Sequence, residues 1–232
     1  MKISVITLFP DLFYPFLNTS ILDRAQDKGM VEYEIVDLRE FGIGTHKSVD
    51  DRPFGGGPGM ILRADVLANA WESVTKNSLS SRKPYTVLMS ASGKPYNETQ
   101  AWELSGIEHL VIICGHYEGI DQRFIDKYVD AEISIGDYVL TGGELPALLV
   151  IDSIVRLLPG VLKKEEAATE ESFSPALSGQ LEYPQYTRPE TFEGEPAPNV
   201  LTSGNHQEIK KWREQKSLEK TKAIRPDLLK RV

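Results

Sequence analysis

Short apolar segments alternate with helix-like segments over the first 160 residues, and this alternation constrains the fold more than any other feature. The expected strands are 3–8, 33–37, 86–90, 110–114 and 132–135. The expected helices are 12–28, 64–75, 97–104, 120–128 and 145–158. Strands that alternate with helices pair into a mostly parallel sheet covered on both faces. The sequence therefore predicts an α/β fold.

The character of the chain changes after this alternation. A strongly charged segment, 163–171, is followed by prolines that interrupt regular structure. Further on, the clearest element is a helix over 206–218 with Asn205 as its N-cap and Ile209, Trp212 and Leu218 near one face. We therefore expect three parts: a first domain at 1–162, a mobile interdomain linker at 163–176, and a small, mainly α C-terminal domain at 177–232.

The charge is unevenly distributed. The net charge of -8 argues against a polyanionic partner, which normally requires a basic surface. Residues 204–232, however, carry nine Lys and Arg against four Asp and Glu. This asymmetry is typical of a basic module on an acidic body, although a solvated surface helix has the same composition.

Cysteine content and hydropathy indicate a reducing compartment and no membrane. Cys114 is the only cysteine and lies in an apolar run, so it cannot form an intramolecular disulfide. No apolar stretch of 18 residues is present. We therefore expect a cytoplasmic protein.

The segment 135–160 combines a strand end, two adjacent glycines and an apolar helix. Gly142 and Gly143 lack a Cβ, so their backbone can approach a ligand closely and adopt positive φ. Glu144 and Pro146 suit the first turn of a helix. The alternative is an ordinary strand-to-helix connection with one solvated arginine, Arg156.

Other glycine-bearing loops follow expected strands at Ser90 and Cys114. Ligands of parallel sheets gather at the carboxyl ends of strands, so we expect these loops and the loop after Ile135 to share one pocket. The glycine-rich segment 55–59 is either a plain surface loop or a loop that lets RNA approach closely. The familiar phosphate-loop, dinucleotide and zinc motifs are absent from the sequence.

Several segments together resemble the bacterial tRNA (guanine-N1)-methyltransferases of the SPOUT class, over nearly the whole chain. They are Ile135-Gly-Asp-Tyr-Val-Leu-Thr-Gly-Gly-Glu-Leu-Pro146, Cys114-Gly-His-Tyr-Glu-Gly-Ile-Asp121, Asp51-Arg-Pro-Phe-Gly-Gly-Gly-Pro-Gly-Met60, Thr187-Arg-Pro-Glu190 and Leu201-Thr-Ser-Gly-Asn-His206. The resemblance implies a trefoil-knotted domain and a homodimer with shared active sites. It also implies methyl transfer from S-adenosylmethionine to the guanosine at tRNA position 37, 3′ of the anticodon. On this resemblance, 1–162 is the cofactor-binding and catalytic domain and 177–232 is an RNA-binding domain.

The resemblance also implies residue roles. The expected S-adenosylmethionine pocket consists of Leu88, Met89, Ser90, Gly93, Gly115, Tyr117, Glu118, Gly119, Ile135, Gly136, Asp137, Tyr138, Val139, Leu140, Gly142, Gly143 and Pro146. The expected tRNA-binding residues are His46, Asp50, Arg52 and Gly57. Glu118 is the expected ligand if Mg²⁺ takes part, because a hard cation prefers oxygen ligands.

Two residues are expected to carry the chemistry. N1 of guanine holds a proton, so a base must remove it as the methyl group arrives, and negative charge then develops on O6. By resemblance the base is Glu171, where the family usually has aspartate, and Arg156 stabilises O6. The sequence also departs from the family in the loop 89–93 and at His116, where many relatives have arginine.

Two other functions are compatible with the sequence. One is a non-catalytic RNA-binding protein on the same fold, which has lost its chemistry through the change from aspartate to glutamate. The other is a nucleotide-binding α/β enzyme unrelated to RNA. The basic C-terminal segment with Trp212 argues against the latter.

Overall fold

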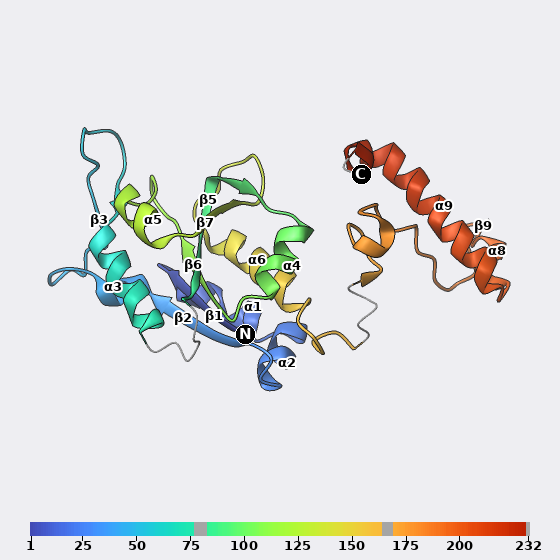
Figure 1. Ribbon diagram of the computed structural model, residues 1–232, viewed down its shortest axis with the longest axis horizontal. Helices are drawn as coiled ribbons and strands as arrows, with labels where there is room; N and C mark the ends of the chain where they lie inside the picture. Colours follow the sequence, from blue (N-terminus) through green and yellow to red (C-terminus); the bar gives the residue numbers. More distant parts are fainter. Residues whose placement is uncertain (77–82, 164–168, 231–232) are drawn as a thin grey trace. The chain divides into compact units, whose positions relative to one another are not determined.

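The computed structural model describes residues 1–76, 83–163 and 169–230. By its internal contacts the chain divides into two compact units, Met1–Leu162 and Lys163–Val232 (Figure 1). Part of the expected linker, residues 164–168, lies outside the described residues.

The first unit is built on a five-stranded parallel sheet. Its strands are β1 (Lys2–Thr7), β2 (Glu32–Asp37), β5 (Tyr85–Pro95), β6 (His109–Cys114) and β7 (Ala131–Ser134). Their order is β2-β1-β6-β5-β7, and every pair is parallel. The prediction of an α/β fold with a parallel sheet is therefore confirmed.

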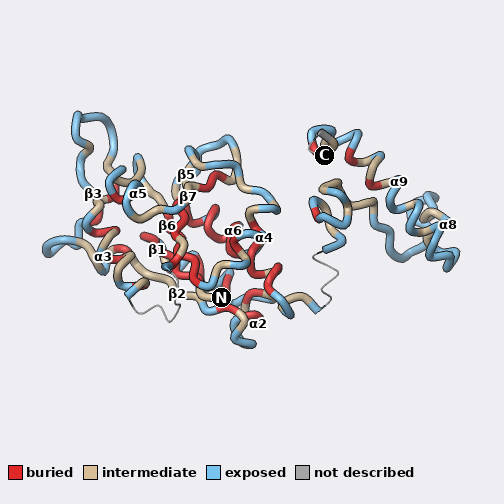
Figure 2. Tube along the Cα trace, in the orientation of Figure 1, coloured by how far each residue is buried: buried red, intermediate tan, exposed pale blue. Residues whose placement is uncertain are grey.

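Helices cover both faces of this sheet. The helices are α1 (Tyr14–Leu17), α2 (Ser20–Asp27), α3 (Ala64–Thr75), α4 (Glu98–Ser105), α5 (Gln122–Tyr128) and α6 (Glu144–Val155), with 3₁₀ turns η1 (Pro10–Leu12) and η2 (Leu38–Phe41). The sheet side chains alternate between two cores. Ile112 belongs to the core that includes residues of α1, α2, α4 and α6, whereas Ile113 belongs to the core that includes residues of α3 and α5. The central strand β6 is buried along its whole length (Figure 2).

The prediction of one helix over 12–28 is wrong. The segment forms η1, α1 and α2 instead, with Thr19 extended between the two α-helices. The hydroxyl of Thr19 donates to the carbonyl of Pro15 at 2.6 Å. Such local side-chain bonds compete with continuation of a helix.

Short hairpins and a long helix complete the structure. In the first unit β3 (Asp50–Asp51) pairs with β4 (Ile61–Leu62). The second unit contains η3 (Pro175–Leu177), β8 (Thr191–Phe192), β9 (Glu195–Pro196), α8 (Asn199–Thr202), α9 (His206–Ile224) and η4 (Pro226–Lys230). The helix expected to end at 218 thus runs to Ile224.

Among the helices of the described ranges, none has the length and apolarity that a membrane span requires.

Candidate functional site

A cavity of about 430 Å³ lies where the loops after β5, β6 and β7 meet. Apolar strand ends form part of its wall, and glycines form much of the rest. The lining residues are Leu88, Met89, Ser90, Ala91, Ser92, Gly115, His116, Tyr117, Glu118, Gly119, Ile120, Gln122, Ile125, Glu132, Ile133, Ser134, Ile135, Gly136, Tyr138, Val139, Leu140, Thr141, Gly142, Gly143 and Pro146. The expected convergence of three loops on one pocket is therefore observed.

Most of the residues expected to bind a cofactor line this cavity, but two do not. Gly93 packs against β7 instead, where a Cβ would lie 2.5 Å from the backbone nitrogen of Ile133. Asp137 is not among the lining residues. Conversely, the sequence analysis did not assign Ala91, Ser92 or His116 to the pocket, and all three line it.

Gly143 is required because two pieces of backbone meet there. Its N–H donates to the carbonyl of Gly115 at 2.8 Å, and His116 and Gly142 form an antiparallel bridge beside it. A Cβ on Gly143 would lie 2.8 Å from both the Cα of Cys114 and the nitrogen of Gly115. This close approach is to the protein's own backbone, and the expected approach to a ligand stays a prediction. Positive φ is not the reason, since Gly143 has a φ of -82° and Gly142 is not among the positive-φ glycines.

Two unusual backbone conformations occur in the pocket wall. Gly136 has a φ of +151°, and a Cβ there would lie 2.5 Å from the ring of Tyr138. Tyr117 has a φ of +58°, which side-chain-bearing residues rarely adopt. Strained positions of this kind are found preferentially at ligand sites.

The glycine-rich loop 55–59 is attached beside the cavity. Glu118 N–H donates to the carbonyl of Met60 at 3.0 Å, and Leu62 forms a parallel bridge with Ile120. A Cβ on Gly59 would lie 2.3 Å from Cγ of Glu118. Glu118 therefore lies between the cavity and this loop.

None of the expected tRNA-binding residues lines the cavity. His46 is exposed in a turn, Asp50 lies on β3, and Arg52 and Gly57 are exposed in the loop that follows β3. Gly57 has a φ of +122°, a conformation available to glycine. No group of three potential metal ligands was found among the described residues, so Glu118 has no cluster of His, Cys, Asp or Glu around it there.

Glu144 begins α6, as its sequence position predicted, but its burial and its bond to β1 were not predicted. Only 4% of this carboxylate residue is exposed, and Oε1 accepts a hydrogen bond from the hydroxyl of Thr7 at 2.8 Å. Thr7 also accepts the N–H of Phe9 at 2.9 Å. Glu144 thus ties the first turn of α6 to the end of β1. Burial, and then the nearby carboxylate of Glu144, raise the pKa of the Cys114 thiol well above its usual value.

Arg156 lies far from the cavity within one chain. It is the C-cap of α6, whose first residue adjoins the cavity at Gly143. A few residues later, a Cβ on Gly160 would lie 3.0 Å from Cε of Met30, which precedes the start of β2. Arg156 is therefore near the end of the sheet at which the strands begin, whereas the pocket lies at the opposite end, where the strands finish.

Glu171 belongs to the second unit, where its segment is hydrogen-bonded to residues further along the chain. The carbonyl of Glu171 accepts the N–H of Ser174 at 3.1 Å. The N–H of Phe173 donates to the carbonyl of Gln180 at 2.8 Å, and the hydroxyl of Ser172 accepts the N–H of Glu182 at 2.9 Å. The described end of the expected linker is thus part of a hydrogen-bonded turn.

Comparison with known proteins shows that this chain is similar to one family along nearly its whole length. Residues 1–231 match the family described as tRNA (Guanine-1)-methyltransferase TrmD. A tRNA (guanine-N(1)-)-methyltransferase of Moorella thermoacetica is 52% identical over 232 residues, covering 100% of this chain and 91% of the relative. Its namesake in Anoxybacillus flavithermus is 51% identical over 229 residues, covering 99% of this chain and 91% of the relative. The tRNA (guanine-N(1)-)-methyltransferase of Carboxydothermus hydrogenoformans is 49% identical over 230 residues, covering 99% of this chain and 88% of the relative.

Proposed function

This chain belongs to the tRNA (guanine-1)-methyltransferase family, and on that premise we propose that it methylates N1 of the guanosine at tRNA position 37, 3′ of the anticodon, using S-adenosylmethionine. The observation that carries the proposal is the cavity at the ends of β5, β6 and β7. It joins the motif-bearing loops of the sequence in one place.

The volume and the lining of the cavity suit S-adenosylmethionine. Its volume of about 430 Å³ lies in the range of small-molecule sites, about 300 to 1,000 Å³. Gly142 and Gly143 present backbone without side chains at its wall, and Tyr117 and Tyr138 add aromatic surface. Bound S-adenosylmethionine supplies a methyl group on a positively charged sulfur.

Residues outside the cavity are proposed to act on the guanine. Glu171 would accept the N1 proton as N1 takes the methyl group, while the electron pair of the broken carbon–sulfur bond would stay on the sulfur. A base is needed because protonated N1 is a poor nucleophile. The guanidinium of Arg156 donates to O6, where negative charge develops, as an oxyanion-hole donor does. These roles would use a carboxylate of the second unit and an arginine at the far end of α6.

The position of Arg156 supports a homodimer with shared sites. The 12 residues of α6 span about 18 Å at about 1.5 Å per residue, which is beyond the reach of an arginine side chain. Arg156 also shares a helix face with Leu145 and Leu149, which are 65% and 45% exposed. Exposed apolar side chains on one face favour contact with another protein surface. We propose that a second copy covers this face and receives Arg156 in its own active site.

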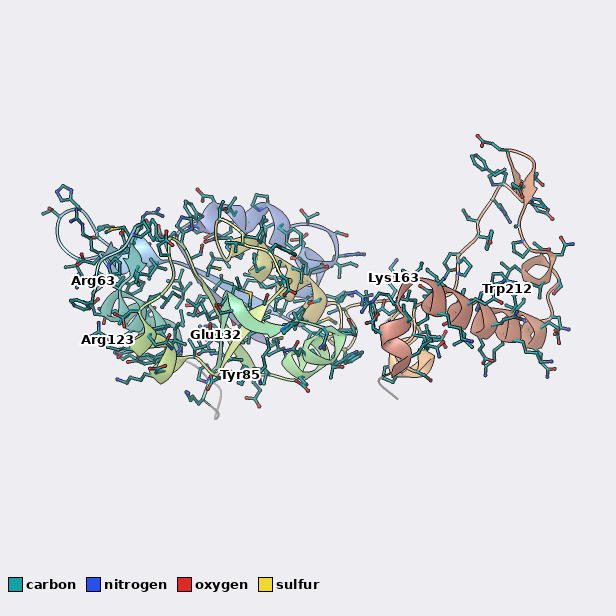
Figure 3. All side chains as sticks on the ribbon, turned by 90° about the horizontal axis from the view of Figure 1, so that it is seen from above. Arg63, Tyr85, Arg123, Glu132, Lys163 and Trp212 are labelled. Carbon is teal, nitrogen blue, oxygen red and sulfur yellow. The ribbon has the colours of Figure 1, made fainter. Side chains whose placement is uncertain are left out.

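The second unit is proposed to bind the tRNA. Along α9, Trp212 contacts the ring of Tyr186 at 6.1 Å between centroids, and the guanidinium of Arg213 lies 4.7 Å from the ring centroid of Tyr183 (Figure 3 labels Trp212). Aromatic and basic side chains together suit RNA, since they stack on bases and neutralise phosphates. His46, Asp50, Arg52 and Gly57 are proposed to contact the RNA near the cavity.

The proposal also includes a bound Mg²⁺ ion and a cytoplasmic location. Glu118 is the proposed protein ligand of Mg²⁺, which typically uses one or two carboxylates and retains water. It is a carboxylate at the edge of the cavity, beside the glycine-rich loop. We place the enzyme in the cytoplasm with its tRNA substrate.

Methyl transfer to anticodon stem-loop transcripts tests the function. Labelled S-adenosylmethionine is supplied with a stem-loop that has guanosine at position 37 and with a matched one that has adenosine there. We expect label on the guanosine substrate alone, at N1. Binding of both stem-loops without transfer of label to either would instead identify a non-catalytic RNA-binding protein.

A further inference from the structure

Two polar side chains are the most buried residues of the helix α9. Ser217 and Thr221 are 1% and 0% exposed, although α9 is otherwise a largely exposed, charged helix. They are one helical turn apart, and the hydroxyl of Thr221 donates to the carbonyl of Ser217 at 2.8 Å. A buried hydroxyl destabilises the folded state unless it is hydrogen-bonded. The hydrogen-bond partners of Ser217 and Thr221 therefore indicate their structural role.

Both hydroxyls hold the same piece of backbone. Ser217 Oγ donates to the carbonyl of Leu181 at 2.6 Å, and Thr221 Oγ1 accepts the N–H of Leu181 at 3.0 Å. Lys220 adds a third bond, from Nζ to the carbonyl of Glu182 at 3.1 Å. Residues 181–182 form no strand or helix, so α9 satisfies polar groups that regular structure would otherwise satisfy.

The backbone held by α9 in turn holds the segment of Glu171. Glu182 N–H donates to Ser172 Oγ at 2.9 Å, one residue from Glu171. Phe173, with a φ of +72°, bonds to Gln180 through its N–H. A left-handed phenylalanine requires surrounding contacts to keep it in place. A continuous series of bonds therefore leads from α9 to the residue beside Glu171.

We infer that Ser217 and Thr221 are positioning residues, which fix the segment 171–182 on the helix α9 and so set where the Glu171 carboxylate is presented. The inference rests on the proposed role of Glu171 as general base. All the contacts that carry it lie within the second unit. In consequence, the helix proposed to bind tRNA and the base are held as one body, so that binding of the RNA carries the base with it.

The test replaces the hydroxyls and measures single-turnover methylation in the full-length enzyme. Thr221→Val keeps the shape of the side chain and removes its bonds, and Ser217→Ala removes a single oxygen. We expect each to lower the rate, by up to the about 10²-fold that small misplacements of catalytic groups cause. Affinities for tRNA and S-adenosylmethionine should stay near those of the parent. Thr221→Ser should restore the rate.

A matched control and a second background separate positioning from a general loss of structure. Thr75→Val removes the hydroxyl of a threonine in α3, which lies in the first unit and does not line the cavity. Like Thr221, Thr75 donates to the carbonyl four residues earlier, that of Trp71 at 2.9 Å, and its replacement should leave the rate unchanged. In a Glu171→Ala background, Thr221→Val should cause no further loss of rate, because its effect passes through Glu171.

The outcomes distinguish this inference from the function on which it rests. A Glu171→Ala enzyme with the parental rate would overturn the assignment of the base. If Glu171→Ala is impaired while Thr221→Val and Ser217→Ala methylate at the parental rate, the positioning role alone is wrong. Equal losses from Thr221→Val in both backgrounds, or a loss of tRNA affinity only, would also overturn it.

Discussion

Gly143 rests on the backbone of Cys114, where a Cβ would come within 2.8 Å of the Cys114 Cα. The last residue of β6 and the residue before α6 are therefore in direct contact, although they are far apart in sequence. Gly142, the neighbouring glycine, faces side chains instead, with Glu144 Oε2 at 2.3 Å and His116 Nδ1 at 3.0 Å from the position of its Cβ. The two glycines should respond differently to substitution.

Gly143→Ala should destabilise the fold, because the atoms that it meets are backbone and cannot move aside. We expect a loss of about 1 to 3 kcal/mol in the free energy of unfolding, typical of an overfilled core. Urea denaturation measures it. Gly142→Ala should destabilise the fold less than Gly143→Ala, because the atoms that it meets belong to side chains, and it should bind S-adenosylmethionine more weakly by calorimetry. Parental cofactor affinity in folded Gly142→Val would contradict the pocket assignment.

The stability of the protein should fall above about pH 8.5 because of Cys114. Its raised pKa keeps the thiol protonated in the folded state, whereas the unfolded chain releases that proton near pH 8.5. The unfolded state then binds fewer protons, so the free energy of unfolding decreases as pH rises, by at most about 1.4 kcal/mol per pH unit. Urea denaturation between pH 7.5 and 9.5 measures the slope, and Cys114→Ala should remove this contribution. An identical slope in both proteins would contradict the prediction.

Elements whose sequence pattern reports burial were predictable. The helix over 64–75 matches α3, and the apolar run 110–114 forms the central strand β6. The strand expected to end at residue 90 extends to Pro95, because an irregularity between Met89 and Lys94 lets it continue pairing with β7. That pairing depends on a strand distant in sequence, which local pattern does not report.

Buried polar anchors were not predictable for a related reason. Helical spacing pointed to Ile209, Trp212 and Leu218 as the inner face of α9, and these are only partly buried. The fully buried residues are Ser217 and Thr221, whose partners are the polar backbone groups of a segment without regular structure. Hydroxyls that serve such a segment look like ordinary surface residues in sequence.

Removal of the second unit should abolish most tRNA affinity and leave cofactor binding intact. The basic helix α9 lies in that unit, whereas the cavity lies wholly in the first. Truncation after Leu162 is expected to weaken tRNA binding, and the affinity of the full-length enzyme should fall with salt as phosphate contacts release counterions. Filter binding at two salt concentrations measures this. Unchanged affinity in the truncated protein would place the RNA site elsewhere.

Glu171→Ala should lower single-turnover methylation by about 10²-fold or more, as loss of a general base does. Cofactor affinity should remain near that of the parent, because Glu171 is not among the residues that line the cavity. Glu171→Asp should retain substantial activity, since it keeps the carboxylate and restores the residue usual in the family. Parental rates in Glu171→Ala would make Asp50 or Glu118 the next candidate.

Arg156 offers the most direct test of a site shared between two chains, because α6 separates it from the cavity of its own chain. Arg156→Ala and Gly142→Leu should each be impaired alone. In a mixed dimer, one site combines the intact cavity of the Arg156→Ala chain with Arg156 from the Gly142→Leu chain. Random mixing should therefore restore about one quarter of the parental activity in a symmetric dimer. Leu149→Glu, on the same exposed face, should weaken the dimer in sedimentation. If mixing restores no activity while the dimers exchange, the cavity and Arg156 of one site do not come from different chains.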